Sequence, residues 1–352
     1  MTAQYFDITQ NSAGWHSAFA FQVFHLLPDD WQKMRWGFNA GALLEEALDR
    51  SRLFIEAQSV NEMQYFDKEQ PIRILVLRGV NIPGEGVRMI LMGKITFPSQ
   101  KPRMEQAGQD YARKISSIFP HDFILAPAKT QDEYYQLARM DLLEQKPQIA
   151  AIKRGRVQIP PMRPYQSFRG IWQASLRSNE QIWRALSNMS QNVMLNILIQ
   201  PSCLFEKDKE RLLHVQNSVI ESEKKDDTLL PYHAWLEEYV KRRISPWTKF
   251  FQVQIHTLFS ETIDENLLRA IGSASTRDSA TLPLPGFEIT RPASDAERDK
   301  WVENIKALSL SHSNEMDDIA DLEETFSVFR FPLRHEFGLP GVNFIAPSDV
   351  AG

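Results

Sequence analysis

Residues 72–97 read IRILVLRGVNIPGEGVRMILMGKITF, and this stretch decides the class of fold that the sequence predicts. The runs 72–78 and 87–97 are rich in β-branched and other large apolar residues, which is typical of strands. Between them, residues 81–86 contain one proline and two glycines. A short link of this composition between two such runs favours a β-hairpin. We therefore expect an antiparallel sheet to begin here.

Helical and strand patterns follow on both sides of this hairpin. Apolar residues recur three or four apart on each side of it, which predicts helices. A short apolar run after the second helix reads as a further strand. These elements predict an N-terminal α+β domain over residues 1–145, with helices at 42–57, 104–118 and 131–144 and a strand at 123–126.

Residues 146–164 carry four prolines, which is typical of a linker. Beyond it, strand-like and helix-like patterns resume, and they predict a second α+β domain over residues 165–322. Two tandem groups of this kind predict an α+β fold made of two ferredoxin-like units, each a split β-α-β arrangement, with additional helices. The strands expected in the second group lie near 167–173, 192–199, 250–259 and 286–290.

Residues 323–352 form a junction segment after the two groups. Its first part, 324–332, reads ETFSVFRFP. A short helix carrying Phe326 and Phe329 is expected to end near Arg330, because Pro332 restricts the residue before it and donates no backbone hydrogen bond. The chain is then expected to reverse direction at 339–341, where proline fixes one backbone angle and glycine permits a positive one.

The junction segment resembles the segment that closes the N-terminal region of VirB4/TraC-like and HerA-like ATPases. These are the hexameric motors of conjugation, type IV secretion and DNA translocation. The residues that carry the resemblance are Glu324, Arg330, Phe331, Pro332 and the run 338–341. The resemblance implies a homo-oligomer that works with a hexameric ATPase domain, in the same protein or as a separate subunit, and that reaches DNA through this partner. It also implies interdomain or partner contacts at Arg330, Phe331, Pro332, Leu339, Pro340 and Gly341.

The sequence departs from such motors in one respect. A nucleotide-binding loop needs Gly-x-x-x-x-Gly-Lys followed by serine or threonine, because the backbone amides and the lysine hold the phosphates. The nearest run is 86–95, in which Lys94 is followed by Ile95 and the pattern is that of a strand. We therefore expect no cofactor and no enzyme activity in this chain, with the ATPase located in its partner.

Composition sets further limits on the class of protein. Hydrophobic residues make up 43% and charged residues 24% of the chain, and the formal net charge is −5, as in ordinary globular proteins. The single cysteine, Cys203, excludes a disulfide framework within the chain. The eight histidines show no metal-ligand spacing, and we predict no metal site. The sequence shows no signal peptide and no long apolar run, so we expect a cytoplasmic protein with no transmembrane segment. Partner proteins could hold it at the inner face of a membrane.

A basic and aromatic stretch at 153–172 supports an alternative function. Its cations are Lys153, Arg154, Arg156, Arg163 and Arg169, and its aromatic residues are Tyr165, Phe168 and Trp172. Cations that bind phosphates beside rings that stack on bases would make a single-stranded nucleic-acid-binding module. In the structural alternative, the cations solubilise a linker and the rings pack on the sheet. The sequence leaves both interpretations open.

The sequence favours a non-catalytic oligomerisation or partner-docking domain of a VirB4/HerA-like motor. It leaves open the transported substrate and the number of subunits. It also leaves open whether the chain is a fragment or a separately encoded subunit, and whether its role is secretion, conjugation, genome processing or phage defence.

Overall fold

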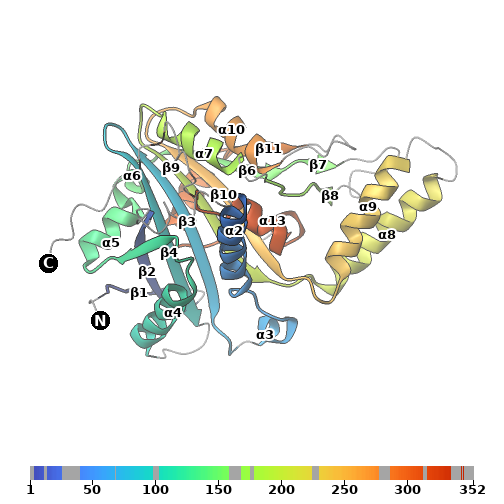
Figure 1. The fold of residues 1–352 in the computed structure, drawn as a ribbon, viewed down its shortest axis with the longest axis horizontal. Helices are drawn as coiled ribbons and strands as arrows, with labels where there is room; N and C mark the ends of the chain where they lie inside the picture. The colour runs from blue at the N-terminus through green and yellow to red at the C-terminus, as the bar shows by residue number, and fades with distance from the viewer. Residues whose placement is uncertain are drawn as a thin grey trace.

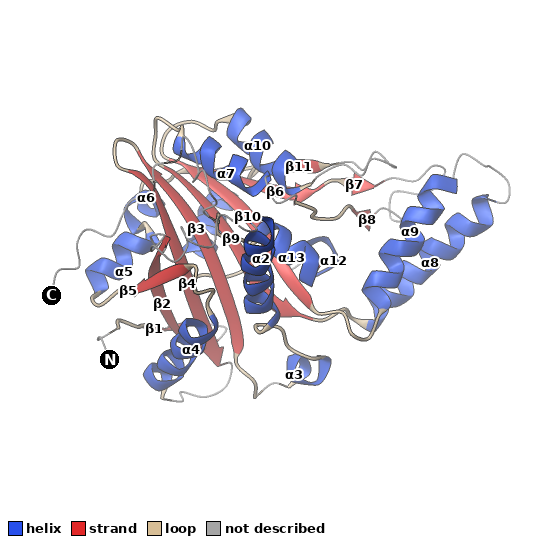
Figure 2. Ribbon diagram, in the orientation of Figure 1, coloured by secondary structure: helices blue, strands red, loops and turns tan. Residues whose placement is uncertain are grey.

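The computed structural model describes residues 4–11, 14–25, 40–67, 69–97, 103–157, 168–174, 178–223, 230–276, 286–311, 315–333, 342 and 344. These residues form a large antiparallel sheet of ten strands with helices on both of its faces (Figures 1 and 2). The α+β class expected from the sequence is therefore confirmed.

Strands and helices of the first half follow the order β-α-β-β-α-β. In the sheet the strands lie in the order β5-β2-β4-β3, and every neighbouring pair is antiparallel. The predicted hairpin is the pair β3 and β4, so that prediction is confirmed. The elements are β2 (Gly14–His25), α2 (Ala40–Glu56), β3 (Ile72–Ile82), β4 (Gly86–Phe97), α4 (Met104–Ile118) and β5 (Phe123–Pro127), with β1 (Asp7–Asn11) also paired to β2 and the short α3 (Glu62–Phe66) before β3.

The second half repeats the same order of elements. Its strands lie in the order β11-β6-β10-β9, again with antiparallel neighbours. The elements are β6 (Gln148–Arg154), α7 (Ser178–Ser187), β9 (Val193–Ser202), β10 (Phe250–Phe259), α10 (Glu265–Ser275) and β11 (Phe287–Thr290). Between β9 and β10 the chain inserts α8 (Glu206–Glu223) and α9 (Leu230–Ile244), a helical hairpin that projects from the body of the molecule (Figure 1).

The two halves meet at β3 and β9, which pair in antiparallel register from Leu75 opposite Ile199 to Asn81 opposite Val193. The sheet is therefore continuous across both halves. The interpretation of 146–164 as a linker is wrong for Gln148–Arg154, because these residues form β6 between β10 and β11. The run 149–152 is buried on both faces, so its residues do not alternate between polar and apolar. Without that alternation, the nearby prolines were the strongest signal in the sequence, and they indicated a linker.

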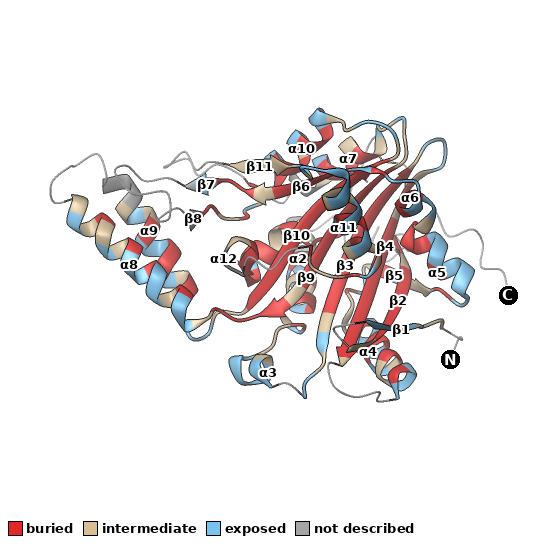
Figure 3. Cartoon of the chain, turned by 180° about the vertical axis from the view of Figure 1, so that it is seen from behind, coloured by how far each residue is buried: buried red, intermediate tan, exposed pale blue. Residues whose placement is uncertain are grey.

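Different helices cover the two faces of the sheet. The four helices of the repeated order, α2, α4, α7 and α10, pack on one face around a common apolar cluster. On the other face lie α5 (Gln131–Ala138), α6 (Met140–Glu144) and α11 (Asp295–Lys306), as Figure 3 shows from behind. The single helix expected at 131–144 is split because Arg139 takes a left-handed backbone conformation, with φ of 55°.

Two buried cations fasten the helices of the second face to the sheet. Arg78 of β3 donates to the carbonyl oxygen of Ala138 at the end of α5 and, at 2.8 Å, to that of Ile305 in α11. Lys94 of β4 donates to the carbonyl oxygen of Ala307 at 2.6 Å. Positive charge is favourable at the carboxyl end of a helix. Lys94, the residue closest to a nucleotide-binding lysine in the sequence, is therefore part of a strand and bound to backbone.

Candidate functional site

Glu324, Arg330, Phe331 and Pro332, which carry the resemblance, belong to a segment that contacts both halves of the sheet. This bridging segment, 317–333, contains the end of α12 (Glu315–Asp318), β12 (Ile319–Asp321) and α13 (Leu322–Val328). Strand β12 pairs with the start of β10, in the second half. Helix α13 lies beside α2, in the first half (Figure 2). The bridging segment therefore contacts both halves of the chain.

Glu324 is the centre of the bridging segment, and its side chain is 0% exposed. One carboxylate oxygen accepts from Arg154 Nη1 at 2.9 Å and from the Trp172 amide at 3.2 Å. The other accepts from Arg243 Nη2 at 2.7 Å and from the Asp321 amide at 3.0 Å. Each carboxylate oxygen of Glu324 thus accepts two hydrogen bonds from groups of this chain, and a buried carboxylate needs such partners because water does not reach it.

The local sequence explains how Glu324 reaches this position. The side chain of Asp321 caps the amide of Glu324, and the side chain of Glu324 bonds back to the amide of Asp321, which is a capping box at the start of α13. Burial alone would raise the pKa of Glu324, but Arg243 and Arg154 outweigh it and hold that pKa below its ordinary value. The carboxylate is therefore charged and paired at neutral pH.

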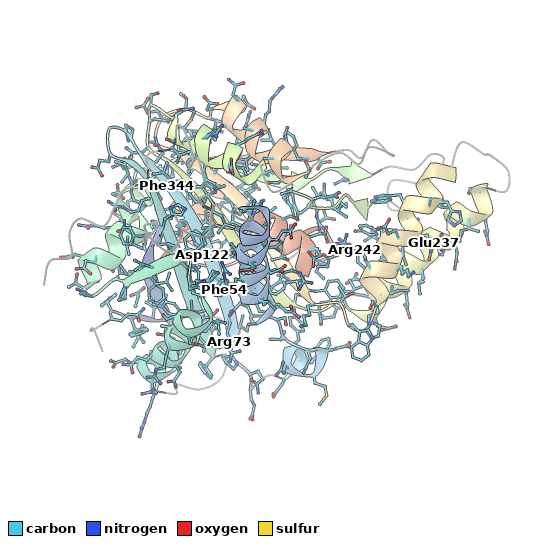
Figure 4. The ribbon with its side chains drawn as sticks, in the orientation of Figure 1. Phe54, Arg73, Asp122, Glu237, Arg242 and Phe344 are labelled. Carbon is cyan, nitrogen blue, oxygen red and sulfur yellow. The ribbon has the colours of Figure 1, made fainter. Side chains whose placement is uncertain are left out.

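Further ion pairs surround this centre. Arg242 binds Asp321 through two hydrogen bonds of 2.8 and 2.7 Å at the base of the projecting hairpin (Figure 4). Arg169 is buried and pairs with Glu288 at 2.6 Å and with Asp317 at 2.9 Å. The network thus connects the bridging segment with β8 (Phe168–Arg169), β11 and α9.

A cavity of about 10 Å³ lies beside the network, lined by Arg154, His256 and Asp317 among others. The network is therefore closely packed, with space beside it for about one water molecule. Among the described residues, no group of three or more histidine, cysteine or acidic side chains is placed to hold a metal ion.

The bridging segment continues into the first half of the chain. Glu323 pairs with Arg52 of α2 at 2.6 Å. The ring of Phe331 packs against Phe119 and Phe123, with ring centroids 5.7 and 5.6 Å away. The carbonyl oxygen of Pro332 lies 2.7 Å from His25 Nε2, at the end of β2.

Arg330, Phe331 and Pro332 were expected to contact another domain or a partner. Arg330 is 4% and Phe331 6% exposed, and both lie in the interior of this chain together with Pro332. Burial lowers the pKa of Arg330 to about 10, and its guanidinium lies over the ring of Phe326 at 5.3 Å. These three residues therefore pack within this chain, and their expected contact with another domain or a partner stays a prediction. Leu339, Pro340 and Gly341 lie outside the described residues.

The residues expected to bind nucleic acid are not gathered on one surface. Arg154 and Arg169 are enclosed by protein carboxylates and carbonyls. Lys153 is half-buried, and Arg156, in β7 (Arg156–Val157), is exposed. Arg163 lies outside the described residues. Trp172 is 4% exposed and packs in the apolar cluster, as the structural alternative expected.

Arg243 and Asp321 were not predicted as site residues. The basic run 241–243 had the ordinary explanation of positive charge at a helix end. The spacing of Asp321 and Glu324 matches a capping box, and this signal could have placed the start of α13. The ion pairs Arg242–Asp321 and Arg243–Glu324 depend on the tertiary fold and leave no local pattern in the sequence.

No protein-family model matches this chain, and no curated protein matches it in sequence. Within the described part of the chain, no helix has both the length and the apolar composition needed to cross a membrane.

Proposed function

We propose that this chain is a non-catalytic docking platform of a VirB4/HerA-like motor. The observation that carries the proposal is the bridging segment, which combines the sequence resemblance with contacts to both halves of the sheet. A buried carboxylate in α13 and a buried phenylalanine after it attach this segment at two separated places. Leu333, at the end of the bridging segment, therefore has a fixed position relative to the whole sheet.

We further propose that each half is a ferredoxin-like unit. The order β-α-β-β-α-β, with the fourth strand beside the first and the third beside the second, supports this proposal in both halves. In the second unit, the hairpin α8–α9 replaces the short turn that joins β3 and β4 in the first. Tandem units of this kind would present helices, sheet edges and the projecting hairpin to subunits or cargo, as a docking platform requires.

The ATPase activity is assigned to the partner, in the same protein or as a separate subunit. Lys94 supports this assignment because its ammonium group is bound to Ala307 and Ser309 inside the protein. The proposal includes a homo-oligomer in the cytoplasm, with DNA contacted through the motor. We do not propose the nucleic-acid-binding alternative, since Arg154 and Arg169 are used in internal ion pairs.

An ATP hydrolysis assay on the purified chain tests the non-catalytic part of this proposal. The expected result is no turnover above buffer. Turnover that disappears on substitution of a residue in this chain would refute it. Light scattering of the same sample tests self-association, for which a monomer at all concentrations is the contrary result.

A further inference from the structure

Strand β1 lies at one end of the sheet and has a neighbour on one side. It pairs with β2 from Asp7 opposite Ala18 to Asn11 opposite Gly14, and no other described strand pairs with it. The four residues after Asp7 are exposed (Figure 3). Edge strands usually carry a lysine, a proline or a bulge, which hinders pairing with another chain. The sequence of β1, DITQN, contains neither lysine nor proline, so its outer edge is suited to accept a further strand.

Asp7, the first residue of β1, adds a charge to this edge. Its carboxylate is half-buried, and within the described part of the chain it has no ion pair and no hydrogen bond. By contrast, Glu288 of β11, at the opposite end of the sheet, pairs with Arg169 at 2.6 Å. Burial raises the pKa of the Asp7 carboxyl group. Ionised Asp7 therefore costs folding free energy, and a cation supplied by a ligand would offset that cost.

Three tyrosines lie beside this carboxylate. Burial, and after it the charge of Asp7, raises the pKa of both Tyr5 and Tyr134, so the carboxylate lies near both phenol groups. The ring centroids of Tyr5 and Tyr134 are 5.7 Å apart, and those of Tyr134 and Tyr135 are 6.0 Å apart. Tyr134 is buried, Tyr5 is half-buried and Tyr135 is exposed. Tyrosine rings attract cations, so these rings and the carboxylate favour the same kind of ligand group.

We propose that the edge of β1 binds an extended segment of a partner protein, and that a basic residue of this segment pairs with Asp7. The segment would add a strand to the sheet through backbone hydrogen bonds, with its cation beside Asp7 and Tyr5. The formal net charge of −5 favours the approach of a basic segment.

Pairing of β1 with β1 of a second copy does not supply this cation, because the strand contains no basic residue to place opposite Asp7. The chemistry of the edge therefore favours a different, basic partner. This proposal does not depend on the function proposed for the bridging segment.

The probe is a short fluorescein-labelled peptide of alternating threonine and valine around one central lysine. Fluorescence anisotropy measures its affinity for the full chain. We expect Asp7→Asn to weaken binding by about five- to tenfold and to reduce its dependence on salt. The matched control is Asp49→Asn, because Asp49 is an exposed aspartate of α2, which covers the other face of the sheet. The control should leave the affinity unchanged.

Urea unfolding separates a binding role of Asp7 from a structural one. Because burial raises the pKa of Asp7, its charged form destabilises the folded chain at neutral pH. Asp7→Asn should therefore unfold at the same urea concentration as the wild type or at a higher one. A lower midpoint would show that the carboxylate supports the fold of this chain, and it would overturn the proposal.

Two altered peptides test the two parts of the recognition. A version with glutamine in place of the lysine loses the charge, and a version with proline on both sides of the lysine keeps the charge but loses backbone donors. Both should bind at least about fivefold more weakly. The proposal is overturned if the original peptide does not bind, or if either altered peptide binds equally well. It is also overturned if lysine amide alone competes as effectively as the peptide, because the site would then be one for small cations.

Discussion

Replacement of Glu324 by glutamine should destabilise the fold strongly. The variant keeps the size of the side chain but removes the charge that faces Arg154 and Arg243. It also places an amide group that donates hydrogen bonds where one oxygen now accepts from two donors. Loss of one partner from a buried charge pair costs about 3–5 kcal/mol. A loss of this size should lower the melting temperature by about 4–7 °C in a chain of this length.

Urea unfolding and calorimetry of both proteins measure this effect. Glu323→Gln is the matched control, because Glu323 is the next residue and its pair with Arg52 is largely exposed. An exposed pair contributes about 0–1 kcal/mol, so the control should unfold almost as the wild type does. The combined variant Glu324→Leu, Arg154→Met and Arg243→Met should recover much of the lost stability, since an apolar replacement of a buried ion network is often tolerated.

A loss of less than about 1 kcal/mol in Glu324→Gln would refute this reasoning. It would mean that water reaches the network and that the bridging segment is not attached at α13. Equal losses in Glu323→Gln and Glu324→Gln would also refute it, because burial would then have no influence on the effect.

Other predictions concern the two faces of the sheet. Burial, followed by the charge of Lys94, lowers the pKa of His16 to about 4. The unfolded chain therefore binds more protons between pH 6.5 and 4, and the unfolding free energy should fall as the pH decreases through this range, by up to about 3 kcal/mol. Urea titrations of the wild type and His16→Gln should show that the variant loses most of this pH dependence. Gly272→Ala would place a methyl group 2.3 Å from the ring of Phe287, and it should cost about 1–3 kcal/mol in urea unfolding, whereas an unchanged midpoint would contradict the packing of α10 on β11.

The sequence predicted most helices and the strands that are bounded by turns. The hairpin at 72–97 was recognisable because glycine and proline separate two β-branched runs. Helix α13 was recognisable because Pro332 follows it closely. These signals are local, and they act through the backbone preferences of single residues.

The strands β2 and β6 were not predicted, for two different reasons. Strand β6 is buried on both faces, so it lacks polar alternation, and prolines on both sides suggested a linker. Strand β2 was not predicted, although the apolar residues Phe19, Phe21 and Val23 alternate along it. The error at β6 placed the start of the second group too late.

The contacts of the candidate site were harder to predict from the sequence than the helices and strands were. The resemblance directed attention to Glu324, Arg330 and Phe331, and it implied that Arg330 and Phe331 contact another domain or a partner. The structure uses them to join the two halves of this chain. The cations that pair with Glu324 are set by the tertiary fold, because Arg154 and Arg243 are distant from it in sequence.

The docking proposal is tested most directly by mixing the purified chain with a VirB4/HerA-like ATPase from the same organism and measuring association by calorimetry. The proposal predicts a defined complex, with all ATP hydrolysis supplied by the ATPase. Alanine substitution of residues 339–341 should weaken the complex, whereas Lys300→Gln should not. The absence of association, or hydrolysis of ATP by this chain alone, would contradict the proposal.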